Sequence, residues 1–302
     1  MSRTPVLSLL LALAATAGCG RGADAPGGMP ANSITVANAG FATPESVAHD
    51  AIEEYYYVSN INGSPLEADD NGFISRLSPD GEVVALKFID GASDAVTLHA
   101  PKGIAVAGNY LYVTDITTLR WFDRRTGEPV GSLEVPGATF LNDVTTTVDG
   151  IVYFTDSGLR AGAGGFEGSG TDAVYRFVPG EKLDTLAMGP DLGRPNGIAV
   201  TGDSVYVVTF GSGELYRVVD GGKADVVALP TGSLDGLVIF DGMVMVSSWD
   251  GSAVYRGPVG GTLGRILEGL EAPADIGHDL WRHRLLIPLF NANEVRIVPL
   301  AF

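Results

Sequence analysis

A short phrase recurs six times along this chain, and the residue in its second position changes from copy to copy. The phrases begin at Pro44, Pro101, Leu141, Pro195, Leu234 and Pro273. Their second positions hold Glu45, Lys102, Asn142, Asn196, Asp235 and Ala274. Two carboxylates and two amide carbonyls, with waters completing the shell, are the donors that a hard cation such as Ca²⁺ prefers. If these four oxygen-bearing side chains meet, they form a metal site.

A local structural explanation competes with the metal site. Asn196-Gly197 and Asp235-Gly236 are common turn dipeptides, and either one alone would indicate only the turn into a strand. A turn does not explain the Glu and Asn that occupy the same position in two other copies. A repeat places equivalent residues at equivalent points of one architecture, so the set as a whole favours a metal. No thiol and no histidine occupies this position, which argues against zinc.

The spacing of the phrases predicts the fold that would bring these side chains together. The period is roughly 40 residues, as in propellers, with extra material in the first and third units. Each phrase contains two apolar strand signals around a Gly or Asp turn, and a further strand signal follows it. We therefore expect an all-β fold, a six-bladed β-propeller whose inner strands line a channel and begin at one face. The N-terminal run 33–36 should supply the outer strand that the last blade lacks beside 294–300, closing the ring.

Composition supports one propeller domain over residues 33–302. The 41 glycines and the 45% apolar content suit many short strands joined by tight turns. The net charge of -17 argues against nucleic acid as a partner, because phosphates require clustered Lys and Arg. It argues equally against binding an anionic membrane through basic patches. The expected partner is a small-molecule substrate, and the sequence does not specify an oligomeric state.

The N-terminus has the features of a bacterial export signal. In residues 1–18, Arg3 precedes a short apolar run, which predicts a signal peptide. The run ends before Cys19, the only cysteine, in a sequence that resembles a lipobox except for Thr16 in place of the usual Leu. We expect Cys19 to be lipidated, residues 19–32 to form a flexible tether, and the protein to be a cell-envelope lipoprotein of the periplasm or outer surface. A plain signal peptide with a chance cysteine is the alternative.

Several motifs resemble those of a known family. LNDV...DGIVYFTDS, PNGIAV...VYVV and LDGL...MVSSW, with PES in the first unit, are similar to the SMP-30/gluconolactonase/LRE-like family of six-bladed propellers, which is related to paraoxonase and diisopropylfluorophosphatase. The resemblance implies one axial catalytic Ca²⁺ held by the residues that correspond one by one, which here are Glu45, Asn142, Asn196 and Asp235. It also implies a calcium-dependent hydrolase of a lactone or other small ester, with a phosphotriester as a further substrate for the same ion.

Lys102 departs from the pattern of the paraoxonase-like members, which carry a proposed histidine base at this position. Three roles are compatible with the sequence. The ammonium could pair with Glu45 or Asp235 and be structural, it could transfer protons with a pKa lowered by the cation, or it could replace the charge of an absent metal. In the hydrolase hypothesis, Asp235 or Lys102 takes a proton from water, so both are candidate catalytic residues.

The pocket around the proposed site is expected to use the ends of the second strands and two insertions. The residues that we place on the pocket wall are Asp115, Asp156, Phe210, Trp249 and Phe290, together with His99 three residues before Lys102. The insertions 60–72 and 158–172 should return to the same face and act as mobile, Gly-rich lids. Simple surface loops are the alternative, more so for the first insertion. The rival function is a non-catalytic ligand-binding or protein-binding propeller of the cell envelope.

Overall fold

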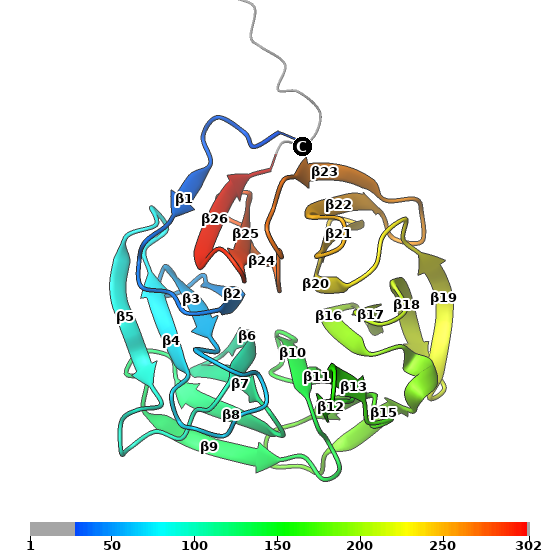
Figure 1. Cartoon of the computed structure of the whole chain (residues 1–302), viewed down its shortest axis with the longest axis horizontal. Helices are drawn as coiled ribbons and strands as arrows, with labels where there is room; N and C mark the ends of the chain where they lie inside the picture. The colour runs from blue at the N-terminus through cyan, green and yellow to red at the C-terminus, as the bar shows by residue number, and fades with distance from the viewer. Residues whose placement is uncertain (1–27, 301–302) are drawn as a thin grey trace, which may run out of the picture.

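The computed structural model describes residues 28–300 and shows a ring of six four-stranded antiparallel sheets around a central axis (Figure 1). The predicted signal peptide and Cys19 lie outside the described residues. Within the described part, the only helical element is the short 3₁₀ turn η1 (Pro190–Leu192), and no helix there is long and apolar enough to cross a membrane. The prediction of an all-β, six-bladed propeller is confirmed.

Each blade runs from an inner strand beside the axis to an outer strand at the periphery. Blade one contains β2 (Pro44–Asp50), β3 (Tyr55–Asn60), β4 (Phe73–Leu77) and β5 (Val83–Asp90), and blade two contains β6 (Pro101–Ala107), β7 (Tyr110–Asp115), β8 (Thr118–Asp123) and β9 (Pro129–Glu134). Blade three contains β10 (Leu141–Thr146), β11 (Val152–Asp156), β14 (Ala173–Phe177) and β15 (Asp184–Met188), and blade four contains β16 (Pro195–Thr201), β17 (Ser204–Thr209), β18 (Glu214–Val219) and β19 (Gly222–Ala228). Blade five contains β20 (Leu234–Phe240), β21 (Met243–Ser248), β22 (Ala253–Pro258) and β23 (Gly264–Glu268).

The sixth blade joins both ends of the chain. It contains β24 (Gly277–Asp279), β25 (Arg284–Leu289), β26 (Glu294–Pro299) and, as its outer strand, β1 (Ile34–Val36). β1 pairs antiparallel with β26, with Ile34 opposite Ile297 and Val36 opposite Val295. The predicted closure is therefore confirmed, and the outer edge of β26 is covered. The inner strand of this blade is shorter than predicted, because residues 273–276 make only isolated bridges, one of them to the inner strand of blade one.

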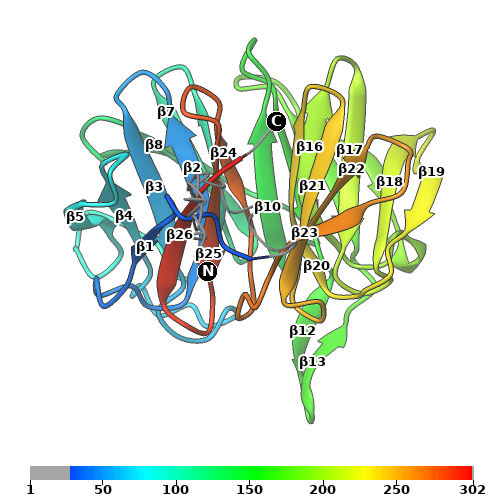
Figure 2. The same ribbon diagram turned by 90° about the horizontal axis from the view of Figure 1, so that it is seen from above.

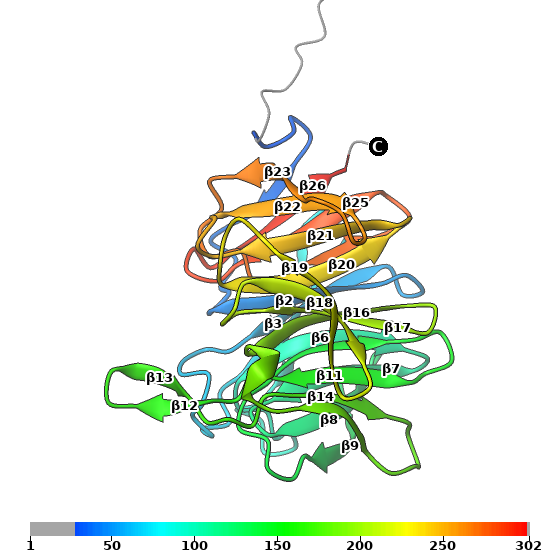
Figure 3. The ribbon, with the colours of Figure 1, turned by 90° about the vertical axis from the view of Figure 1, so that its right-hand side faces the viewer.

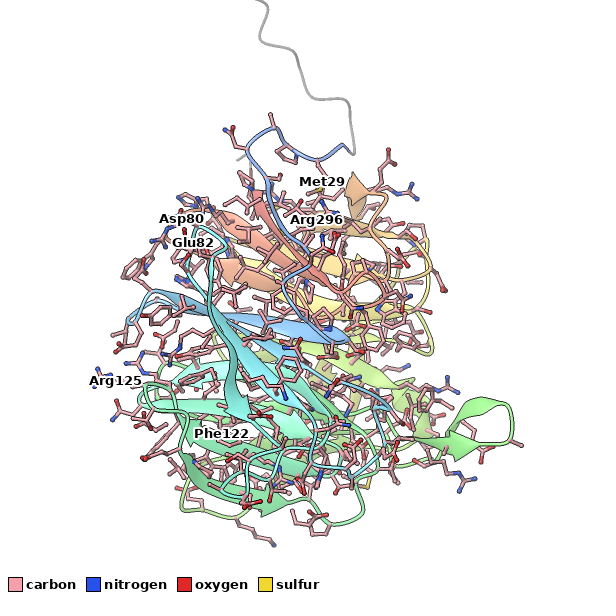
Figure 4. All side chains as sticks on the ribbon, turned by 60° about the vertical axis from the view of Figure 1, so that its left-hand side comes forward. Met29, Asp80, Glu82, Phe122, Arg125 and Arg296 are labelled. Atoms are coloured by element: carbon pink, nitrogen blue, oxygen red, sulfur yellow. The ribbon has the colours of Figure 1, made fainter. Side chains whose placement is uncertain are left out.

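The apolar core lies between the blades. One cluster of buried side chains combines Leu119 of blade two with Phe154 and Tyr175 of blade three, and the other clusters also join neighbouring blades. Each strand alternates its side chains between the two faces of its sheet, so every blade has apolar residues for both neighbours. At the periphery, Figure 4 shows the side chains of Asp80, Glu82 and Arg125 extending from the body. The packing fixes the blades relative to one another and so fixes the inner strands around the axis.

The inner strands share a bulge that aims two residues at the axis. In the first five blades, the pairing of inner and second strands is interrupted between the first and the fourth residue of the phrase. A bulge leaves the intervening residues out of the ladder and redirects their side chains. The second and third positions of the phrase lie in this gap, and all six residues in the second position are buried. The sheet therefore presents these side chains at the axis.

Hydroxyl groups of the second strands hold the bulged backbone in place. Thr155 Oγ1 accepts a hydrogen bond from Asp143 N (3.1 Å) within its own blade and donates to the carbonyl of Asn196 in the next blade (2.8 Å). Ser247 does the same with Gly236 N (2.7 Å) and the carbonyl of Ala274 (2.8 Å). These bonds satisfy backbone groups that the bulge removes from the ladder. Each hydroxyl thus links the third-position N–H of its own blade to the second-position carbonyl of the next blade.

Close contact between inner strands requires glycine at the third position of three phrases, Gly103, Gly197 and Gly236. A Cβ on Gly103 would lie 2.6 Å from Asp143 Cα, and a Cβ on Gly236 would lie 2.2 Å from Ile276 N. Neither neighbour is a flexible side chain, so any larger residue would force the blades apart. The glycines permit the narrow axis on which the second-position side chains converge.

Candidate functional site

Five of the six second-position side chains line one cavity of about 260 Å³ at the end of the axis where the inner strands begin. They are Glu45, Lys102, Asn142, Asn196 and Asp235, each no more than 6% exposed. Ala274 has no polar group and does not line the cavity. The structure thus brings together the four predicted oxygen donors and the lysine that departs from the pattern. The bulges described above place them there.

Each of the four donors directs an unpaired oxygen into buried surroundings. The atoms are Glu45 Oε2, Asn142 Oδ1, Asn196 Oδ1 and Asp235 Oδ1, and none has a hydrogen-bond partner among the described residues. A buried polar atom without a partner costs about 1–3 kcal/mol. Such atoms are rare in native proteins and point to an ion or water that belongs in the site. The turn explanation for Asn196 and Asp235 does not account for four such oxygens in one cavity.

The amide of Asn142 has a fixed orientation. Its Nδ2 donates to Ser157 Oγ (3.0 Å), and Ser157 Oγ in turn donates to the carbonyl of Pro195 (2.6 Å). Because the serine proton is used on Pro195, Ser157 can only accept from Asn142, and the amide must present its oxygen to the cavity. The side chain of Asn196 lies beside the Asp235 carboxyl and favours its ionised form, and its own Oδ1 has no partner among the described residues. Both amides therefore act as acceptors toward the cavity.

The donor set fits a hard cation. It consists of two carboxylate oxygens and two amide oxygens, which suit Ca²⁺. The described residues contain no cluster of three or more His, Cys, Asp or Glu side chains arranged for a metal. A calcium ion in this cavity would take Glu45, Asn142, Asn196 and Asp235 as its ligands, with water or substrate completing the coordination.

Burial disfavours the ionised forms of Glu45 and Asp235 when no cation is bound. It raises the pKa of Glu45 and of Asp235 well above the usual range. The charge of Asp235 raises the pKa of Glu45 further, and Asp275 raises both, whereas Lys102 lowers only that of Glu45. Two buried carboxylates need a positive charge to remain ionised at neutral pH. A divalent cation would supply it.

Lys102 does not form the ion pair considered from the sequence. Among the described residues, no carboxylate oxygen lies within 4.0 Å of its Nζ; instead the ammonium donates to the carbonyl of Ala100 (3.2 Å) and lies 4.4 Å from the centre of the Phe140 ring. Burial lowers the pKa of Lys102 to about 8, against the opposing charges of Asp115, Glu45 and Asp156. The amine is therefore able to exchange a proton near neutral pH.

Three of the residues predicted for the pocket wall line the cavity in the structure. Phe210, Trp249 and Phe290 line the cavity and contact one another in sequence, edge to face with ring centres 5.6 Å apart for the first pair and tilted at 4.9 Å for the second. These aromatic rings come from the ends of the second strands of blades four, five and six. They form one continuous apolar side of the cavity.

Asp115 and Asp156 do not line the cavity, and the sequence register assigned to them is wrong by one residue. Asp115 pairs with Pro101 at the first position of its phrase, as Thr209 pairs with Pro195. The equivalents of Phe210 are the following residues, such as Ser157, which does line the cavity. A shift of one residue in a strand turns the side chain to the other face. The two aspartates instead cap loops, since Asp156 accepts from Phe140 N (2.9 Å) and Gly158 N (2.8 Å).

His99 also lies away from the cavity. Its Nδ1 accepts a hydrogen bond from Asp70 N (3.1 Å), and its own backbone N–H donates to Asp115. The ring therefore connects the first insertion to the loop that precedes Lys102. The prediction of His99 as a pocket residue is wrong, although its loop contributes the carbonyl that binds Lys102.

Asp115 is expected to stabilise the loop that carries Lys102. Its buried carboxylate accepts from Ala100 N (2.7 Å) and forms an ion pair with Arg120 Nε (2.6 Å). We expect Asp115→Ala to lower the free energy of unfolding by about 3 kcal/mol, because it leaves a largely buried guanidinium unpaired. Urea denaturation measures this change. Asp184→Ala is the control: it removes an exposed partner of Arg176 and should cost under about 1 kcal/mol. Equal effects of the two variants would contradict this assignment.

Both insertions border the cavity. Ile61, Gly63 and Pro65 come from the first insertion, and Leu159 and Phe166 come from the second. The second insertion is an ordered hairpin, β12 (Leu159–Gly162) and β13 (Gly165–Gly168), where a Gly-rich loop was predicted. Figures 2 and 3 show this hairpin projecting from the body of the propeller.

A second polar layer at the third position of the phrase was missed from the sequence. Ser46 Oγ donates to the Asp275 carboxylate, and Asp143 Oδ2 accepts from Ile198 N (2.7 Å) in the next blade. Both aspartates are buried; burial raises the pKa of Asp143 well above its usual range and that of Asp275 to about 7. Reading the third position of the six phrases in register would have shown this layer.

Comparison with known proteins supports the architecture. No protein-family model and no curated protein matches this sequence. Among solved structures, a gluconolactonase from Xanthomonas campestris is similar over 92% of this chain and 95% of its own, with a TM-score of 0.69 and 20% identity. A putative gluconolactonase is similar over 90% of this chain and 93% of its own, with a TM-score of 0.63 and 17% identity. A streptogramin B lyase matches over 89% and 97%, with a TM-score of 0.63 and 11% identity. At these identities the likeness establishes the propeller fold alone.

Proposed function

We propose that this protein is a calcium-dependent hydrolase that opens a lactone or cleaves another small ester. The observation that carries the proposal is the set of four unpaired oxygens, from Glu45, Asn142, Asn196 and Asp235, that face one cavity. Gluconolactonases among the structural neighbours support the same reaction class. We further propose that Cys19 anchors the protein in the cell envelope through a lipid after export.

The chain supplies the groups that such a hydrolysis needs. When bound, the cation would polarise the ester carbonyl and stabilise the negative charge that develops on its oxygen. Asp235 or Lys102 takes a proton from the attacking water. Lys102 suits this role because burial lowers the pKa of its amine to about 8, so that roughly a tenth of it is neutral at pH 7 and more at higher pH. Water adds to the carbonyl carbon, the ring C–O bond breaks, and the alkoxide that leaves takes the proton back from the base, so that a single hydroxy acid is formed.

A non-catalytic binding propeller is the alternative, and the fold by itself does not decide between the two. A chain of the nidogen/laminin complex has a similar structure, with a TM-score of 0.58 and 16% identity over 74% of this chain and 80% of its own. The two functions differ in what the cavity does. A screen of lactones and aryl esters with a pH indicator, run with Ca²⁺ and then with chelator, tests the proposal. Absence of turnover in both conditions would favour the binding module.

Calcium is expected to stabilise the folded protein more at pH 8 than at pH 5. Folding raises the pKa of Glu45 and Asp235, so below the raised values both are protonated and bind cations poorly. At pH 8 and Ca²⁺ at 100 times its Kd, stabilisation of about 2.7 kcal/mol should raise Tm by roughly 5–10 °C. Differential scanning calorimetry at both pH values measures this difference.

The metal-free protein should show the opposite trend over the acidic range. Carboxyls whose pKa is higher in the folded than in the unfolded state bind more protons when folded, so stability falls as pH rises from about 4 toward 7.

Glu45→Gln should abolish most of the rise in Tm that calcium causes, whereas Glu181→Gln, at an exposed position, should preserve it. An unchanged calcium shift in Glu45→Gln would contradict the assigned ligand set.

A further inference from the structure

We infer that the substrate carries an apolar alkyl or aromatic group beside its ester, which distinguishes it from a polyhydroxylated sugar lactone. This inference rests on the proposed function, since it concerns the substrate of the same cavity. It comes from the composition of the cavity wall and from an exposed aromatic side chain at its edge.

The cavity separates its polar and apolar residues. Six polar side chains line it: the five second-position residues and Ser157, all buried. Apart from Gly63, the other lining residues are aliphatic or aromatic, and only Trp249 among them carries a polar group, its indole N–H; they are Ile61, Pro65, Phe140, Leu159, Phe166, Phe210, Trp249 and Phe290. The polar residues come from the inner strands and the first residue after β11. The apolar residues come from strand ends and from both insertions.

A sugar lactone would fit this wall poorly. Each of its hydroxyl groups would exchange water for an apolar surface, at a cost of about 1–3 kcal/mol when no partner is provided. Most of the polar groups present are already committed, since Ser157 binds Asn142 and Pro195, and the four free oxygens suit a cation. The donors that remain are the indole N–H of Trp249 and the N–H groups of Lys102 that do not bind Ala100, and they provide no acceptors for the hydroxyl protons of a sugar. An apolar substituent meets no such cost and gains from burial.

The apolar wall extends to the surface through the hairpin. Phe140, beneath the Lys102 ammonium, contacts Phe166 of β13 edge to face, with ring centres 6.2 Å apart. Phe166 is 53% exposed, and Figures 2, 3 and 4 show that its hairpin stands clear of the body. These two rings form an apolar surface that runs from Lys102, the proposed proton-transfer residue, to the solvent. An alkyl chain attached to a reacting ester would lie along them.

The size of the cavity supports this placement. At about 260 Å³ it is slightly smaller than the roughly 300–1,000 Å³ typical of small-molecule sites. A lactone ring at the polar residues would fill part of this space, so a short substituent would lie against the apolar wall and a longer one would extend to the mouth. Phe166 then supplies contact area for the emerging chain. This makes Phe166 a specificity-determining residue.

The test compares γ-lactones whose alkyl chain grows one methylene at a time with gluconolactone, using the calcium-loaded protein. We expect kcat/KM to rise about fourfold per methylene, which corresponds to about 0.8 kcal/mol each. Gluconolactone should be the poorest substrate. Phe166→Ala should lower kcat/KM about tenfold for the longest chain and little for the shortest, while Phe166→Leu should retain most of the preference. Ile52→Ala removes an apolar side chain that is 70% exposed in the β2–β3 turn at the other face, and should change nothing.

A binding measurement separates this inference from the proposed function. Alkyl lactams of the same chain lengths have the same shape but resist hydrolysis, and calorimetry gives their Kd. Hydrolysis without a chain-length preference, or with gluconolactone preferred, would overturn the apolar substrate and leave the hydrolase. Absence of hydrolysis with tighter lactam binding for longer chains would overturn the hydrolase and support an apolar ligand. Absence of both would overturn both.

Discussion

Asp235→Asn is expected to lower kcat/KM for the best lactone by about a thousandfold or more. The substitution keeps the shape of the side chain and one oxygen, but it removes a negative charge from the ligand set and a candidate base. General-base catalysis alone contributes typically about 10²–10⁴-fold, and weakened calcium binding adds to the loss. Initial rates at saturating Ca²⁺, together with the calcium Kd from calorimetry, separate the two contributions.

Without calcium, the Asp235→Asn variant should have a free energy of unfolding at least as large as that of the unmodified protein. Burial raises the pKa of Asp235, which shows that its ionised form is unfavourable in this cavity without a cation. Replacing it by a neutral amide removes that cost. Thus the variant should lose the calcium-dependent rise in Tm without losing the fold. Asp203→Asn, at an exposed position in the β16–β17 turn, is the control and should retain full activity. Activity within tenfold of the original in Asp235→Asn would disprove its assigned role.

The repeat in the sequence was sufficient to predict the ring and its polar centre. Equivalent positions of a periodic chain must lie at equivalent points around an axis, so Glu45 and Asp235 could be placed near each other although 190 residues separate them (235 − 45). The closing strand was also predictable, because the last blade lacked a partner for residues 294–300 and only one unassigned strand signal remained. Both predictions depend on the repeated phrase and on the order of the strand signals, which can be read directly from the sequence.

The parts that were not predictable depend on side-chain direction and on contacts between blades. Asp115 resembles Phe210 in its place at a strand end, yet one residue of register turns it to the loop instead of the cavity. The orientation of Asn142 depends on Ser157, whose proton is used by the carbonyl of Pro195 in the next blade. The environment of Lys102 depends on Phe140, from the loop that enters blade three. Such contacts join distant segments and have no signature in a single stretch of sequence.

Lys102→Met is expected to lower kcat by about 10²–10⁴-fold and to strengthen calcium binding. Methionine approximates the length of the side chain but has no amine, so proton transfer is lost. Removing a positive charge that Glu45 senses should make the cavity more favourable for Ca²⁺. A purely structural lysine would change calcium affinity and leave kcat and its pH dependence in place. Measuring the calcium Kd beside the pH profile of kcat distinguishes these outcomes.

The pH profile identifies the form of Lys102 that acts. A base must be neutral, and the amine is neutral above its pKa, so activity should rise with pH through a step at or below about 8, since bound calcium lowers the pKa further. Lys102→Met should remove this step. Lys102→Arg is the decisive comparison, because arginine keeps the positive charge but does not release its proton. If the arginine variant is as inactive as the methionine variant, proton transfer explains the role of Lys102. If the arginine variant is active, the positive charge explains the role of Lys102, and Asp235 remains as the candidate base.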